Sequence, residues 1–239
     1  MFEWFKKRRA AIVAPRITPR KDVELTAEKV NLADMSPDAV SLVAQVAYFE
    51  LAVFESLSRA VSEAPDLASK EGISTVAGEA LEKHHGLVAI LRTLKADPAE
   101  AMAPFAADID RFETLTRGRD WYETLVGVYL TAGFLNEFFL ALAVSLPPKH
   151  RKVVKELLES DRTADVLVAA IRAGEESDPK LASRLALWGR RLMGDTQLVA
   201  RSALRLSDNA SDNESKLEPV FTDLVGSHSK RMDALGLTA

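Results

Sequence analysis

Apolar residues recur every three or four positions over most of the chain, and no segment alternates apolar and polar residues with a period of two. This spacing gathers apolar side chains on one face of a helix, so it predicts an all-α fold. Proline residues divide the pattern, because proline starts or ends helices more readily than it continues them. The first helix should take Ser36 as its cap and Pro37 in its first turn. The long helices that we expect are 36–62, 71–94, 120–145, 149–173 and 179–206, followed by a polar loop at 207–213 and a short terminal helix from residue 215.

The segment 95–119, between the second and third expected helices, is too long for an unstructured loop in a compact domain. Phe105, Ile109 and Phe112 follow one another at the spacing i, i+4, i+7. That spacing predicts a short amphipathic helix within this connection.

Length and composition fit one large helical domain. At 239 residues the chain can bury a substantial core. We find no apolar run of the length that a membrane-spanning helix needs, and no secretory signal at the start. Cysteine is absent, which excludes disulfides and thiolate metal ligands and makes a reducing cytoplasm the default location.

Positive charge is concentrated at the N-terminus. Residues 1–21 carry a net charge of +6, whereas the whole chain carries −4. Three aromatic residues lie beside four consecutive cations at positions 6–9, a mixture that suits RNA or an anionic membrane surface. The alternative is a disordered tail that packs Trp4 or Phe5 onto the domain. We therefore expect a flexible basic extension at 1–35 and a helical domain at 36–239.

Two glutamates interrupt apolar stripes. Glu50 lies in the stripe of the first expected helix, and Glu137 lies in that of the third. An isolated buried carboxylate is costly, so each must be neutralised, paired or bound to a metal. Both are candidate metal ligands, with an arginine or water partner as the alternative.

Glu82 and His85 form the one Glu-x-x-His motif of the sequence, and at this spacing they share a helical face. The motif is half of the ligand set of a di-iron or di-manganese helical bundle. Small residues on the same face leave room for a metal, although they equally permit close helix packing. His84 points elsewhere and is expected to be a partly buried structural histidine.

The fourth expected helix should carry the second motif of such a site, and it does not. Arg162 follows Glu159 at the position where a histidine would be needed, and a guanidinium has no lone pair for a metal. Asp161 and Asp165 interrupt the apolar stripe of this helix. They are either oxygen ligands or salt-bridge partners, and we favour salt bridges slightly.

Several stretches together resemble a family of ferritin-like proteins related to the di-iron tRNA hydroxylase, which acts on methylthio-isopentenyl-adenosine in tRNA. The resemblance covers about 40–237 and rests on 48–51 (YFEL), Glu82-x-x-His85, 101–105 (AMAPF), 119–121 (RDW), 187–192 (LWGRRL) and the stretch 228–237. It implies a ferritin-like four-helix bundle with additional C-terminal helices. The long connection at 95–119 is also what such a bundle requires.

The resemblance further implies a carboxylate-rich di-iron centre that activates oxygen, which would make the protein an oxidoreductase. Its ligands carry over to Glu50, Glu82, His85 and Glu137, and Asp161 would replace a missing ligand. Iron is the metal implied, with manganese or no metal as alternatives. Two hypotheses follow: a hydroxylase with an atypical metal site, or a degenerate ferritin-like protein kept for binding or scaffolding. The substrate stays unidentified, and a homo-oligomer is one alternative for the assembly.

Overall fold

A computed structural model describes residues 32–159, 163–204 and 210–238. The basic segment 1–21, with its predicted RNA or membrane contacts, lies outside these described residues. Within them the regular structure is helical, with no strand, which confirms the predicted all-α fold. The helices are η1 (Leu32–Met35), α1 (Ala39–Glu63), α2 (Leu67–Thr93), α3 (Pro98–Leu115), α4 (Trp121–Leu142), η2 (Ala143–Ser145), α5 (Pro148–Glu159), α6 (Thr163–Ser177), α7 (Pro179–Ser202) and α8 (Ala210–Ala234).

Aspartate caps fix where the long helices begin. The side chain of Asp38 accepts a hydrogen bond from Ser41 N at 3.0 Å, so α1 is capped by Asp38 and not by Ser36 as predicted. Asp66, Asp97 and Asp120 cap α2, α3 and α4 in the same way, each accepting from the backbone N–H three residues on. An aspartate at this position satisfies an N–H that the helix leaves without a partner.

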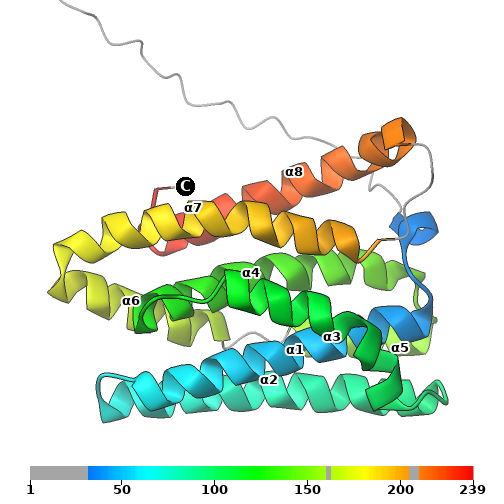
Figure 1. The fold of residues 1–239 in the computed structure, drawn as a ribbon, viewed down its shortest axis with the longest axis horizontal. Helices are drawn as coiled ribbons and strands as arrows, with labels where there is room; N and C mark the ends of the chain where they lie inside the picture. The colour runs from blue at the N-terminus through cyan, green and yellow to red at the C-terminus, as the bar shows by residue number, and fades with distance from the viewer. Residues whose placement is uncertain (1–31, 160–162, 205–209, 239) are drawn as a thin grey trace, which may run out of the picture.

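Four helical segments build a bundle, which Figure 1 shows from the side. The antiparallel pair α1 and α2 packs on α4 and on the α5–α6 segments. Helix α3 is the crossover that connects α2 to α4 in the chain. Helices α7 and α8 cover the opposite side of α4. Helix α4 is therefore enclosed on both sides, which explains its nearly continuous run of buried residues.

The core lies between these helices and is filled by large apolar side chains. Phe49, Phe134 and Phe138 are almost completely buried, and leucines of α1, α2 and α4 surround them. The ring centroids of Phe138 and Phe221 lie 5.9 Å apart, so α8 joins the same core. Burial of this kind supplies most of the driving force for folding.

Several predicted boundaries were wrong. Helix α2 begins four residues before the expected start, and the fourth expected helix is two elements, α5 and α6. Helix α8 starts at Ala210, so residues 210–213 of the expected loop at 207–213 are helical. The helix predicted within 95–119 is confirmed as α3 and fills most of that connection.

Two helices are apolar enough over 18 residues to cross a membrane by length and composition, contrary to our expectation of none. They are Ala39–Glu63 and Trp121–Ser145, and 67% of the apolar window of each is buried within the domain. Their hydropathy follows from their central place in the helical core.

Candidate functional site

A cavity of about 220 Å³ lies inside the bundle. Its walls come from α1, α2, α4, α5, α6 and α8, and its apolar lining consists of valine, alanine and leucine side chains. The polar and charged residues that line it are Glu50, Lys83, Tyr129, Asn136, Glu137, Glu159, Thr163 and Arg231. Ala80, Ala132 and Gly133 are small residues on facing helices, which leaves the space open.

The two glutamates singled out from the apolar stripes both line this cavity. Glu50 is buried, with 2% of its surface exposed. Glu137 is less buried than predicted, because 40% of its side chain remains exposed. The structure therefore brings together two of the four predicted ligands that it describes.

Arg231 of α8 is the partner of Glu137. Its Nη2 atom donates to Glu137 Oε1 and to Gly133 O, the latter at 2.9 Å. Its Nη1 atom is buried and has no hydrogen-bond partner among the described residues. A Cβ atom added at Gly133 would collide with the guanidinium, so the glycine is what lets Arg231 lie against α4. Metal binding and an arginine or water partner were the alternatives predicted for these glutamates, and Glu137 has the arginine partner.

Lys83 brings a second cation to the cavity wall. Only 8% of its surface is exposed, although lysine is rarely buried without a partner. Lys83 forms no hydrogen bond or ion pair with any other residue in the described part of the chain. Sequence reasoning missed it, but Val76, Ala80, Lys83 and Leu87 form a stripe on α2 that a cation interrupts. The test that found Glu50 would have found Lys83.

The Glu-x-x-His motif does not face the cavity. Glu82 and His85 are both exposed, and the small residues beside them, Gly78 and Ala89, are exposed too. The inward orientation predicted for this face of α2 was wrong. The neighbouring face is buried instead: His84 donates from Nδ1 to Ala47 O at 2.8 Å, which confirms its predicted structural role.

The fourth helix contributes little that can be tested. Asp161 lies outside the described residues, and Asp165 on α6 is exposed. Throughout the described ranges, no group of three or more His, Cys, Asp or Glu residues is arranged to hold a metal ion. The cavity is lined by the carboxylates of Glu50, Glu137 and Glu159 beside two cations and by no histidine among the described residues, which does not fit the carboxylate and imidazole set of a di-iron centre.

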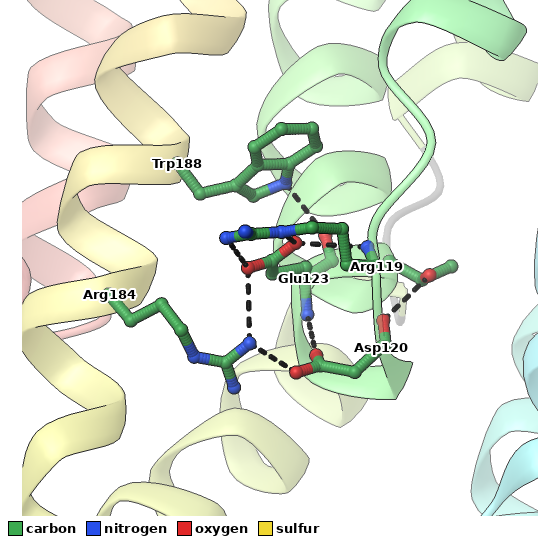
Figure 2. A network of polar contacts seen from close by, with 6 residues as sticks. Arg119, Asp120, Glu123, Arg184 and Trp188 are labelled. Atoms are coloured by element: carbon green, nitrogen blue, oxygen red, sulfur yellow. Dashed lines mark hydrogen bonds and ion pairs between the residues drawn. The ribbon is translucent and has the colours of Figure 1, made fainter.

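A separate buried network ties the start of α4 to α7 (Figure 2). Glu123 is completely buried and accepts from Arg119 N at 2.9 Å, from Arg119 Nη2 at 2.9 Å and from Arg184 Nη1 at 3.0 Å. Trp188 Nε1 donates to the carbonyl oxygen of Glu123 at 3.0 Å. Burial acts to raise the pKa of Glu123, but the hydrogen bonds and charges of the two arginines outweigh it and lower the pKa. Asp120 caps α4 by accepting from Glu123 N, and the contacts of Glu123 are structural in character.

A second, smaller polar cavity of about 150 Å³ lies between α1, α3 and α4. Glu113 lines it and accepts a short hydrogen bond from the Ser56 hydroxyl, to which Arg59 Nη2 also donates at 2.7 Å. Burial raises the pKa of Glu113, although the bond from Ser56 and the charge of Arg59 oppose it. These groups hold α3, the crossover helix, against α1.

Four helical segments around an interior site, with a long crossover between the second and third, define a ferritin-like bundle. The family of ferritin-like domains described from actinomycetes matches residues 35–211, and the chain belongs to this family. No curated protein matches the chain. Helix α8, which supplies Arg231, lies almost wholly beyond the matched region.

Proposed function

We propose that this ferritin-like bundle binds a small organic molecule in its central cavity and works without a di-metal centre. The observation that carries the proposal is that Lys83 and Arg231 line the same cavity as Glu50 and Glu137. It corresponds to the second hypothesis drawn from the sequence, a ferritin-like protein kept for binding.

Electrostatics favours this function over metal binding. A pair of divalent metals needs surplus negative charge, whereas Lys83 and Arg231 offset Glu50 and Glu137, and the third lining carboxylate, Glu159, pairs with Lys155. Like charges repel most strongly where little water screens them, as in an interior cavity. The imidazoles do not compensate, because His84 Nδ1 is bonded to a carbonyl and His85 faces outward.

A second candidate is the di-iron hydroxylase that the resemblance to the tRNA hydroxylase implies. The observation in its favour is that Glu50 and Glu137 line one cavity. Glu82 and His85 would have to join them, and Lys83 would have to leave. Consecutive helix residues point about 100° apart, so α2 would have to turn by roughly that angle about its axis.

Thermal unfolding in the presence of Fe(II) or Mn(II), under anaerobic conditions, separates the two candidates. A ligand at 100 times its dissociation constant stabilises a protein by about 2.7 kcal/mol, which is a Tm shift of roughly 5–10 °C for a chain of this size. We expect a shift below about 1 °C in the wild type and in Glu50→Gln. A shift of the larger size that Glu50→Gln abolishes would contradict the proposal and support the hydroxylase.

A further inference from the structure

We infer that the cavity takes a small carboxylic acid with a hydrogen-bond donor next to its carboxylate, and that Lys83 receives the carboxylate. The inference rests on the proposed function and narrows it to one ligand chemistry. It is drawn from the charge of Lys83, the carboxylate of Glu50 and the size and lining of the cavity.

The position of Lys83 indicates a ligand that carries an anionic group. Lys83 is more than nine-tenths buried and lines the cavity, and its Nζ is not among the fully enclosed polar atoms that lack a partner, so the ammonium keeps contact with accessible space. A largely buried cation beside such space is a favourable position for a bound anion. Arg231 differs, because it already forms an ion pair with Glu137.

The position of Glu50 indicates a hydrogen-bond donor on the same ligand. A carboxylate oxygen accepts up to two hydrogen bonds, so Glu50 can receive a ligand hydroxyl or ammonium in addition to its protein contacts. Glu50 and Lys83 come from the adjacent helices α1 and α2 and line the same cavity. The lining therefore offers a positive and a negative group from adjacent helices, which suits an amino acid or a hydroxy acid.

Size and lining restrict the rest of the ligand. A volume of about 220 Å³ is below the roughly 300–1,000 Å³ of pockets that hold drug-sized molecules. The remaining wall is aliphatic, from residues such as Val53, Val128, Leu140 and Leu158. A short branched aliphatic chain matches this lining better than an aromatic or a charged one.

Saturation-transfer NMR with four matched probes tests the inference: L-valine, 2-hydroxyisovalerate, isovalerate and L-valinamide. We expect saturable binding of valine or hydroxyisovalerate, which tells an amino acid from a hydroxy acid. Isovalerate, which lacks the donor, and valinamide, which lacks the carboxylate, should bind at least about 10-fold more weakly, a loss of roughly 1.4 kcal/mol. If neither valine nor hydroxyisovalerate binds, or if valinamide binds as well as valine, the inference is overturned.

Lys83→Met removes the charge and keeps a flexible apolar side chain of similar length, and it should weaken binding at least about 10-fold. Lys70→Met is the matched control, because Lys70 is an exposed lysine on the same helix, and it should bind as the wild type does. Without ligand, Lys83→Met should raise Tm by roughly 2–4 °C, since a charge without a partner is removed. A lower Tm in Lys83→Met would assign Lys83 a purely structural role and overturn the inference.

The two proposals fail in different ways. A metal-dependent rise in Tm that Glu50→Gln abolishes would overturn the proposed function itself. If none of the acids binds and metal does not raise Tm, only the inferred ligand class is overturned.

Discussion

At the scale of single residues, two buried glutamates show that the partner and not burial alone decides how a carboxyl group titrates. Two arginines hold Glu123 in its charged form, so its pKa is lowered. Burial dominates at Glu113, where the Ser56 hydroxyl and the charges of Arg59 and Arg117 do not compensate, so its pKa is raised. The two groups therefore contribute to stability in opposite pH ranges.

Glu123→Gln should lower the free energy of unfolding at pH 7 by about 1–3 kcal/mol, because two arginines lose a charged acceptor. A lowered pKa means that the contribution of Glu123 is present above its unfolded pKa of about 4.3 and is lost as pH falls through the folded pKa. The difference between wild type and variant should therefore shrink on acidification. Urea unfolding at several values between pH 7 and pH 3 measures it, and a difference that grows towards low pH would contradict this role.

The residue scale also explains which parts of the site the sequence could predict. Glu50 was found because a charge in an apolar stripe is visible in one helix, and the structure buries it as expected. Lys83 interrupts the apolar stripe of α2 in the same way, but the adjacent Glu-x-x-His motif favoured a different face of that helix. Whether any of the five predicted ligands binds metal stays a prediction.

At the scale of elements, α2 shows how a helical face can be misassigned. Small residues on the face of Glu82 and His85 were interpreted as room for a metal, but Gly78 and Ala89 are exposed and Gly86 packs closely against Leu157. The face that α2 buries carries Lys83 and His84, whose long or amphipathic side chains can enter a core when polar atoms find partners or a cavity. The existence of the long helices was easier to predict than their bounds, since Asp38 and not Ser36 caps α1 and α2 begins four residues early.

Glycine positions give a prediction at this scale. Gly133→Ala should destabilise the protein by about 1–3 kcal/mol, because the added methyl group collides with the guanidinium of Arg231 and must displace it from Glu137. Gly78→Ala is the matched control, since a Cβ there meets nothing within 4 Å, and it should stabilise α2 by about 0.5–1 kcal/mol. Chemical unfolding of both variants measures the two effects. Equal stabilisation by both would show that Arg231 does not lie against α4.

At the scale of the whole molecule, the additional C-terminal helices change the chemistry of the bundle. The sequence predicted these helices but not their position, because a contact such as that of Arg231 with Glu137 joins residues 94 positions apart. No local pattern encodes which helix face meets which. By covering α4, helix α8 brings a cation to a cavity whose carboxylates would otherwise suggest metal.

The ferritin-like fold was predictable because it depends on periodicity, helix length and one long crossover, and the match to the actinomycete ferritin-like domain supports it. The interior site depends on helix rotation and on distant pairs, so only part of it was predictable. The central claim is therefore about the site: its charged residues serve an organic ligand and not two metal ions.

The most direct test is the metal content of the purified full-length protein, produced in cells supplemented with iron and manganese and measured by inductively coupled plasma mass spectrometry. The account predicts well under about 0.1 metal ions per chain, with no difference between wild type and Glu50→Gln, because Lys83 and Arg231 offset the cavity carboxylates. Close to two iron or manganese ions per chain in the wild type, lost in Glu50→Gln, would contradict it.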